Sequence, residues 1–432
     1  MGEQPAAPGL GAFDSLRAED EPWLAACFVP PQDFDLIAGA RSVLIFGPPG
    51  AGKTALFLAL QRHLNATGRL VVEWQPPQPG RDASQSLTAI DLFHHVLSRI
   101  ACALLAYLTE RPDRFMAAPS RQAISWFIYR YLDEEMSPQQ ERLLGMREPH
   151  PWLEGRPAAH LINELVKAWR KVGISATVVL TALDGPPHPG QGLDGLGAFF
   201  STLTLFENRG LVYKVIAPAG LKTPLALTGS VDRRRVDTYF LRWSAQDLVE
   251  MVLRRMTLAA GEPIENLSAL CEDADLVHWL ENTGGGSPRG WLESVRPLAV
   301  QRLAQGRPVQ TAEWHCIRQE SPPPLMFDAE DPHVVVTGWR RIDDLPEVPL
   351  ALLRYLYDHR GRVCSRNELF HQAYLPARYP DVAEREREMG IDYRSLLDTT
   401  ISRLRDRIEP DPRRPIYIIT SRGQGYKLEH AW

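Results

Sequence analysis

The stretch from Ser42 to Leu56, SVLIFGPPGAGKTAL, constrains the fold of this chain more than any other. An apolar and partly β-branched run, 42–46, comes first, and a glycine-rich segment, 47–54, follows it. Leucines at helical spacing begin directly afterwards. This order predicts a buried strand, a tight loop, and a helix whose N-terminus points at the loop.

The loop has the spacing G-x-x-x-x-G-K-T of the Walker A motif, in the strand and helix context that this motif requires. Its glycines let phosphates approach backbone N–H groups, and the dipole of the following helix attracts anions. Lys53 supplies a cation for the β- and γ-phosphates, and the Thr54 hydroxyl is a ligand for Mg²⁺. The residues expected to bind ATP or ADP are Gly47, Pro48, Pro49, Gly50, Ala51, Gly52, Lys53, Thr54 and Ala55. The segment before this strand, 13–37, is a candidate wall for the base.

Length and composition favour a globular protein of several domains. The chain has 432 residues, of which 44% are hydrophobic, enough for two or three full cores. The most apolar stretch, 87–108, is interrupted by Asp91, His94, His95 and Arg99, so we predict no membrane span. The N-terminus lacks a signal-peptide pattern, and the five cysteines lack metal-ligand spacing. We therefore expect a cytoplasmic protein with reduced cysteines.

A second strand of the nucleotide site is expected at 176–183, directly before Asp184. Asp184 is the candidate catalytic acid of a Walker B strand and, with Thr54, the candidate Mg²⁺ ligand. A hydrolysing site usually has a second acid that orients water, but Thr181 and Gly185 occupy the neighbouring positions. The sequence therefore predicts Mg²⁺ and nucleotide binding and leaves open whether the chain is a weak ATPase.

Strands alternate with helices up to residue 243, which predicts a parallel sheet covered by helices on both faces. Further strands are expected at 69–74, 211–217 and 239–243. An aromatic helix, 124–132, is predicted to belong to the core. A capping box, Ser244 to Asp247, then begins a group of helices that includes the turn 284–289, GGGSPR.

In this order of elements, residues 13–305 resemble AAA+/STAND-type P-loop ATPases of the Orc-like and NACHT-like branch. The resemblance implies a nucleotide-binding core followed by a helical lid, in which Pro288 and Arg289 contact the nucleotide. A solvated start of a helix is the alternative interpretation of Arg289. The Walker B strand departs from the family, and the chain has no room for the long repeat sensor usual in STAND proteins.

The C-terminal hundred residues contain a second specific pattern at 396–428, LLDTTISRLRDRIEPDPRRPIYIITSRGQGYKL. Helices at 349–359, 365–373 and 393–408 and a final β-hairpin predict a winged helix-turn-helix. Residues 400–428 hold seven basic and three acidic residues in a chain of net charge −5. This local excess of positive charge is typical of a DNA-binding surface.

Residues 325–430 resemble the C-terminal effector domain of OmpR/PhoB-type response regulators. The resemblance implies double-stranded DNA as a partner, with the third helix in the major groove and the wing at the minor groove. The residues expected to contact DNA are Thr399, Thr400, Ser402, Arg403, Arg405, Thr420 and Arg422. The loop 375–392 is longer than usual in the family, and its acids, Glu384, Glu386 and Glu388, are candidate contacts for a partner such as RNA polymerase.

The predicted fold class is α/β: a parallel-sheet P-loop NTPase core with a helical lid, followed by an α+β winged helix-turn-helix domain. We predict an N-terminal segment, a core, a lid, a linker and a winged domain at 1–30, 31–243, 244–318, 319–332 and 333–432, with strands of the last domain from 325.

Two functions fit this organisation. One is a nucleotide-dependent bacterial transcriptional regulator, in which ATP or ADP controls how a homo-oligomer presents its DNA-binding helices. The alternative is a STAND-like oligomerising scaffold for signalling or defence, whose winged helix binds protein. The specific wing motif favours the regulator. A motor ATPase is disfavoured, because the second Walker B acid is missing.

Overall fold

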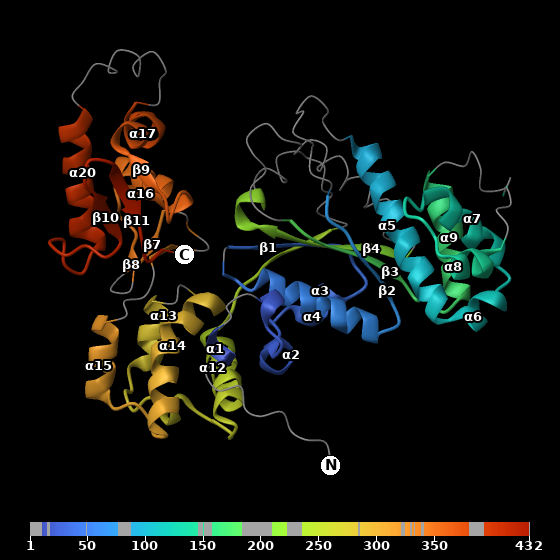
Figure 1. Ribbon diagram of the computed structural model, residues 1–432, viewed down its shortest axis with the longest axis horizontal. Helices are drawn as coiled ribbons and strands as arrows, with labels where there is room; N and C mark the ends of the chain where they lie inside the picture. Colours follow the sequence, from blue (N-terminus) through green and yellow to red (C-terminus); the bar gives the residue numbers. More distant parts are fainter. Residues whose placement is uncertain are drawn as a thin grey trace.

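The computed structural model spans residues 1–432 and describes 11–14, 18–48, 50–76, 88–145, 150, 158–183, 210–222, 236–283, 286–320, 325–328, 331, 333–337, 341–379 and 393–431. Figure 1 shows an α/β core in the centre, a group of helices packed at one end of it, a second group below and to the left, and a small domain above that. The domain boundaries predicted from the sequence remain a proposal.

Five of the described strands form the parallel sheet of the core. They are β1 (Val43–Gly47), β2 (Leu70–Glu73), β3 (Thr177–Ala182), β4 (Leu211–Pro218) and β5 (Asp237–Phe240), in the spatial order β2–β3–β4–β1–β5. The parallel sheet expected from the alternating pattern is confirmed. Because β1 lies between β4 and β5, the loop that follows it opens at the carboxyl ends of interior strands, where ligands of such sheets bind.

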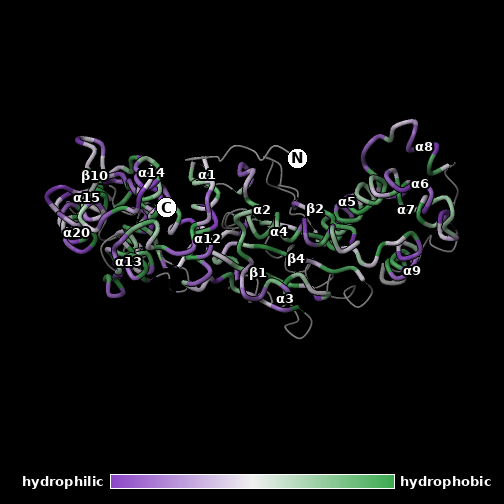
Figure 2. The backbone as a smooth tube through the Cα atoms, turned by 90° about the horizontal axis from the view of Figure 1, so that it is seen from below, coloured by the Kyte–Doolittle hydropathy of each residue, from purple (hydrophilic) through white to green (hydrophobic). Residues whose placement is uncertain are grey.

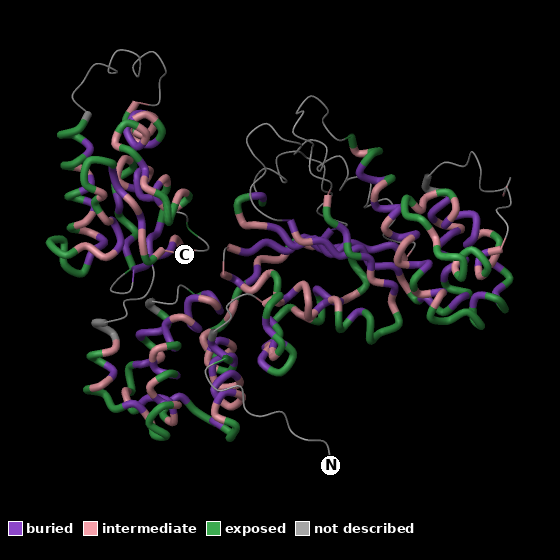
Figure 3. The backbone as a smooth tube through the Cα atoms, in the orientation of Figure 1, coloured by how far each residue is buried: buried purple, intermediate pink, exposed green. Residues whose placement is uncertain are grey.

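Alternate side chains of β1 enter two different cores. Val43 and Ile45 pack with leucines of α4 (Lys53–Ala66) on one face, and Leu44 and Phe46 pack with the opposite core. Burial on both faces accounts for the continuous apolar runs in the strands, which Figures 2 and 3 show as hydrophobic and buried.

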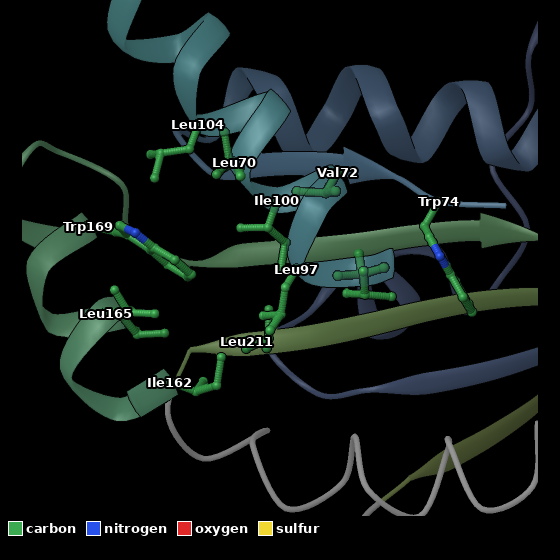
Figure 4. Close-up of a cluster of buried hydrophobic side chains, with 14 of the residues drawn as sticks. Leu70, Val72, Trp74, Leu97, Ile100, Leu104, Ile162, Leu165, Trp169 and Leu211 are labelled. Carbon is green, nitrogen blue, oxygen red and sulfur yellow. The ribbon is translucent and has the colours of Figure 1, made fainter. Parts of the chain in front are cut away.

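The second face of the sheet is covered by α5 (Ala89–Glu110) and α9 (Ala158–Lys171). Leu97, Ile100 and Leu104 of α5 and Trp169 of α9 lie over β2 and β3 (Figure 4). Between these helices come α6 (Pro112–Met116), α7 (Arg121–Tyr131) and α8 (Pro138–Leu144). The core role predicted for the aromatic helix is confirmed, because Phe127 is fully buried against Trp169.

Among the described residues, one helix, α5, is long and apolar enough to cross a membrane by length and composition. Half of its apolar window is buried inside the protein, and the helix packs on β2 and α7. In this fold α5 serves as a core helix of the α/β domain.

The N-terminal segment contains α1 (Gly11–Asp14), η1 (Ala18–Asp20) and α2 (Leu24–Cys27), and α3 (Phe34–Ala38) leads from it into β1. The lid contains α12 (Ala245–Ala260), η4 (Leu267–Ala269), α13 (Leu276–Thr283), α14 (Pro288–Gln305) and α15 (Thr311–Glu320). The predicted capping box at Ser244 and Asp247 begins α12. Phe13 and Val29 are buried in the core of the lid, so the N-terminal segment is packed onto it.

The C-terminal part is a winged helix-turn-helix, as predicted. Its short first sheet consists of β6 (Met326–Phe327), β7 (Val335–Val336) and β8 (Arg341–Ile342). The helices are α16 (Glu347–Asp358), the continuous series α17 (Arg366–Leu369), η5 (Phe370–Tyr374) and α18 (Leu375–Arg378), and α20 (Tyr393–Ile408). The second sheet joins β9 (Val363–Ser365) to the hairpin of β10 (Ile418–Ser421) and β11 (Gly425–Leu428).

A buried carboxylate connects the end of α20 to the hairpin. Glu409 is 1% exposed and accepts hydrogen bonds from the backbone N–H groups of Ile416, Tyr417 and Ile418, at 2.8 to 3.1 Å. This contact gives a structural reason for the I-E-P-D-P segment, because the acid satisfies backbone donors that a turn would otherwise leave buried and unpaired.

Glu409→Ala removes the acceptor of these three backbone donors. We expect it to destabilise the hairpin by about 3 kcal/mol and to accelerate amide hydrogen exchange over 416–428 in the full chain. The control is Glu429→Ala, which removes only a partly exposed partner of Lys427 and is expected to cost under about 1 kcal/mol. Equal exchange rates in the two variants would contradict the role given to Glu409.

Candidate functional site

The phosphate loop runs from β1 to α4 with the backbone shape that its glycines allow. Gly50 and Gly52 have φ values of 78° and 84°, in the left-handed region that favours glycine. Gly52 is the N-cap of α4 and has no side chain to occupy the N–H groups of the first turn. These donors, with the helix dipole, form a site suited to an anion. Pro49 lies outside the described residues.

The two polar side chains of the motif lie at the start of α4. Lys53 Nζ donates hydrogen bonds to the carbonyl oxygens of Gly47, at 3.1 Å, and Pro48, at 2.7 Å. The ammonium group is therefore held directly over the loop. Thr54 is exposed one residue later, so its hydroxyl is accessible to a ligand.

The start of α14 and the Trp243 side chain both donate hydrogen bonds to the backbone of the phosphate loop. The Arg289 N–H donates to the carbonyl oxygen of Gly50 at 3.3 Å, and Trp243 Nε1 donates to the carbonyl oxygen of Ala51 at 2.9 Å. A Cβ atom added to Gly50 would lie 3.2 Å from the Arg289 Cβ, and one added to Gly52 would lie 3.7 Å from Pro288 Cγ. The structure thus brings Pro288 and Arg289 to the loop, while their contact with a nucleotide stays a prediction.

A cavity of about 280 Å³ lies where the loop, the N-terminal segment and the lid meet. Its walls include Gly50, Gly52, Lys53, Thr54 and Ala55 from the loop and α4; Glu19, Glu21, Leu24, Cys27, Phe28 and Val29 from the N-terminal segment; and Trp243, Met251, Arg255, Pro288, Arg289 and Leu292 from the lid side. The sequence indicated the N-terminal segment only as a whole. The lid residues other than the Pro-Arg pair were missed, because no local motif marks them.

A buried ion pair belongs to the same wall. Glu21 Oε2 lies 2.6 Å from Arg255 Nη2, and Arg255 Nη1 donates to the carbonyl oxygen of Ala12 at 2.8 Å. The two side chains are only 4% and 6% exposed. Burial raises the pKa of the Glu21 carboxyl, and the charge of Arg255 acts in the opposite direction.

The predicted acid of the Walker B strand cannot be placed, since Asp184 and Gly185 lie outside the described residues. Thr181 is described; it is 1% exposed and its hydroxyl oxygen has no hydrogen-bond partner in the protein. Within the part of the chain that the structure describes, no group of three or more His, Cys, Asp or Glu could hold a metal ion. The Mg²⁺ site of Thr54 and Asp184 therefore remains a prediction.

Arg289 also acts on groups beyond the loop. Burial raises the pKa of Glu293, one turn later on α14, to about 7, and the charge of Arg289 opposes this rise. Burial raises the pKa of Tyr357 on α16 to about 12, and the charge of Arg289 again opposes it. The start of α14 thus lies within electrostatic reach of the winged domain.

On α20, the predicted DNA-binding face is exposed. Thr399, Ser402 and Arg403 are exposed and Thr400 is half-buried. The two threonine hydroxyls donate to carbonyl oxygens one turn earlier, at 2.7 and 2.8 Å, and retain lone pairs for other donors. Among the described residues, Arg403 and the exposed Arg422 of the wing form no ion pair.

Two further candidates contact each other. The Arg405 guanidinium donates to the carbonyl oxygen of Ile418, at 2.6 and 3.1 Å from two of its nitrogens, and to Thr420 Oγ1 at 2.7 Å. Both side chains therefore join α20 to the wing, a structural role that the sequence did not indicate. Their contact with DNA stays a prediction.

Asp398, on the same helix, has its negative charge balanced by partners within the winged domain. Asp398 Oδ1 accepts hydrogen bonds from Arg366 Nε at 2.9 Å and from the Tyr426 hydroxyl at 2.6 Å. Burial opposes ionisation, but these two bonds hold the pKa of Asp398 below its ordinary value. The sequence pointed to none of these three residues as partners. The acids Glu384, Glu386 and Glu388 lie outside the described residues.

These features define a protein that joins a P-loop α/β core and a helical lid to a winged helix. Residues 344–428 match the family described as "Transcriptional regulatory protein, C terminal". The sensory transduction protein RegX3 of Mycobacterium leprae is 37% identical over 109 residues, which cover 24% of this chain and 46% of that protein. RegX3 of Mycolicibacterium smegmatis is 37% identical over 109 residues and 40% of its length. The chain thus spans less than half the length of these curated relatives.

Likeness to solved structures is weak. The ORC1 protein of Aeropyrum pernix, solved in complex with DNA, aligns over 98% of this chain and 94% of its own, with 15% identity and a TM-score of 0.32. The response regulator DrrB of Thermotoga maritima, an OmpR/PhoB homolog, aligns over 63% and 94% with 16% identity and a TM-score of 0.20. Structural similarity this low supports no conclusion about the fold or function of this protein. The predicted resemblance to a regulator's C-terminal domain is confirmed by the sequence matches alone.

Gly50→Ala tests the approach of the lid to the loop. The new Cβ meets both a left-handed backbone and the Arg289 Cβ at 3.2 Å, whereas Gly68→Ala has a φ of 69° and nothing within 4 Å. Each variant should lose about 1 to 2 kcal/mol of unfolding free energy, because alanine is strained at a positive φ. Gly50→Ala should lose about 1 kcal/mol more, because its Cβ is crowded by Arg289. Hydrogen exchange should rise at 287–292 in Gly50→Ala alone. The contact is refuted if both variants leave this segment equally protected.

Proposed function

We propose that this protein is a nucleotide-dependent bacterial transcriptional regulator. The observation that carries the proposal is the match of residues 344–428 to the C-terminal domain of transcriptional regulators, in a chain whose core presents a Walker A loop. Double-stranded DNA is the partner of α20 and the wing, and ATP or ADP with Mg²⁺ is the ligand of the loop. We place the protein in the cytoplasm, with a second copy of the chain and RNA polymerase as further partners.

The arrangement of α20 supports DNA as the ligand. Arg403 and Arg422 are exposed, while Arg405 is occupied by the hairpin and Asp398 by Arg366. Arg403 and Arg422 are therefore available to DNA phosphates, and the negative charge of Asp398 is balanced by Arg366. Glu409 and Arg405 fix the angle between helix and wing, so both can meet one duplex without rearrangement.

The cavity supports nucleotide as the controlling ligand. The anion-binding start of α4, the Lys53 ammonium group and the Thr54 hydroxyl lie on one side, and apolar residues of the N-terminal segment and lid complete the walls. Arg289 lies against the loop, so a phosphate bound there attracts its guanidinium and acts directly on the start of α14. The nucleotide acts in this proposal as a switch, independent of its hydrolysis.

Arg403→Ala should weaken binding of the full chain to a mixed-sequence DNA duplex at low salt by about tenfold and reduce the dependence of log K on log[salt] by about one. The matched control is Arg360→Ala, an exposed arginine of the same domain that packs on Tyr357 at the end of α16. Fluorescence anisotropy across a salt series measures both quantities. Equal losses in the two variants would refute a DNA contact specific to α20.

Lys53→Ala should weaken binding of Mg-ATP, measured by titration calorimetry, by about a hundredfold, because the cation over the loop is lost. Arg62→Ala is the control, since it removes an exposed positive charge from the same helix, away from the loop. DNA affinity measured with and without ATP should differ in the control and not in Lys53→Ala. ATP-dependent assembly on a sizing column with no retention of DNA by the wild type would favour the oligomerising scaffold instead.

A further inference from the structure

Among the residues that the structure describes, the winged domain exposes one large hydrophobic side chain. Leu396, near the start of α20, is 40% exposed. The residues of the same helix that are buried in the domain core are Leu397, Ile401, Leu404 and Ile408. Leu396 therefore lies outside the apolar stripe that packs on the core. Figures 1 and 2 show α20 on the side of the winged domain that faces away from the α/β core.

Leu396 shares one face of α20 with residues that are expected to contact DNA. Thr399, Thr400 and Arg403 follow it by three, four and seven positions, which is the spacing of neighbours on one side of a helix. This face begins with an apolar side chain and ends with an exposed cation. Duplex DNA suits both ends, because its phosphates border a groove in which some bases present methyl groups.

The two threonines offer no hydroxyl proton to a ligand. Thr399 Oγ1 donates to the carbonyl oxygen of Ser395 at 2.7 Å, and Thr400 Oγ1 donates to that of Leu396 at 2.8 Å. Because both protons are used within the helix, a methyl group and oxygen lone pairs remain for a base. The first half of this face therefore presents apolar surface and no hydrogen-bond donor from these side chains.

Thymine is the base whose major-groove edge matches such a surface. It presents a 5-methyl group beside the O4 acceptor, and the other three bases carry no methyl group there. We propose that Leu396, together with the methyl groups of Thr399 and Thr400, binds the 5-methyl group of a thymine in the major groove. This inference rests on the proposed DNA binding and adds a base preference to it.

The position of this thymine follows from the spacing along α20. Leu396 and Arg403 are seven residues apart, which corresponds to about 10.5 Å along a helix axis. Successive base pairs rise by about 3.4 Å. The thymine therefore lies about three base pairs from the phosphate or guanine that Arg403 contacts. Binding removes the Leu396 side chain from water, so a duplex that carries the methyl group gains affinity from the contact.

An exposed leucine with no ligand, or one covered by a partner protein, is the competing explanation, because single apolar side chains occur on most protein surfaces. The explanations differ in what controls the affinity for DNA. Only a direct contact makes this affinity depend on the thymine methyl group and on Leu396 together, so that loss of one cancels the effect of losing the other.

The test begins with selection of duplexes from a random pool by the full chain, with Mg-ATP at low salt. In a selected duplex, each thymine is then replaced in turn by uracil, which lacks only the 5-methyl group. Fluorescence anisotropy should show that the wild type loses about fourfold in affinity at the contacted thymine and nothing at thymines outside the contact. For Leu396→Ala, the loss at that position should fall below about twofold, because the largest apolar contact is absent.

Two further variants are the controls. Arg403→Ala should weaken binding of both duplexes and preserve the ratio between them, because it removes a charge and leaves the methyl contact. Val300→Ala removes a side chain of similar exposure, 39%, from α14 in the lid, and should change neither the affinity nor the ratio. Loss of the methyl group also changes the flexibility of the duplex, but it does so alike for every variant, so the difference between the ratios measures the contact.

Equal binding of the thymine and uracil duplexes by the wild type at every position overturns thymine reading and leaves DNA binding intact. A full fourfold loss that persists in Leu396→Ala overturns it as well, and assigns this side chain to another surface. The wild-type comparison does not depend on any variant folding. Failure of the full chain to enrich any duplex from the pool overturns the proposed DNA binding itself, and this inference with it.

Discussion

The candidate nucleotide site depends on one close approach between two stretches of backbone. The Arg289 N–H donates to the carbonyl oxygen of Gly50, whose φ of 78° favours glycine, and a Cβ added there would lie only 3.2 Å from the Arg289 Cβ. Because the contact joins the loop to the first turn of α14, the lid becomes a wall of the cavity. The N-terminal segment, packed into the core of the lid, then closes another side. Three segments, one of them about 190 residues beyond the other two, thus enclose one space.

Buried charged groups connect distant segments elsewhere in the chain as well. Lys214 on β4 is fully buried and donates to the carbonyl oxygens of Gly39 and Arg41, just before β1. Arg255 attaches Ala12 to the lid, and Glu409 attaches α20 to the hairpin. Backbone groups compensate the charges of Lys214 and Glu409, and Arg255 is compensated by the Glu21 carboxylate together with the carbonyl oxygen of Ala12. Removal of any of these charges would leave buried polar groups unpaired. These groups set how neighbouring elements lie, and therefore the geometry of both candidate sites.

Much of the architecture could be predicted because its signals are local. The Walker A loop, the capping box at Ser244 and the wing hairpin each depend on residues a few positions apart, and each lies where the sequence indicated. The roles of other residues could not be predicted from local patterns. Arg405 and Arg403 are both arginines of the same basic helix and look alike in the sequence. The Arg405 guanidinium nevertheless donates hydrogen bonds to the hairpin, because its side of α20 faces β10. Glu21 and Arg255 carry no motif, and 234 positions separate them.

The sequence by itself determined the elements and the class of each site: a phosphate loop between a strand and a helix, and a basic helix beside a wing. Those properties follow from residue types at short spacing, which the chain carries wherever it folds. Only the tertiary structure decided which arginines remain exposed, which lid residues meet the loop, and that an acid and an arginine share the cavity wall. Such facts depend on contacts between distant segments, which hydrophobic burial and backbone hydrogen bonding establish for the whole chain at once.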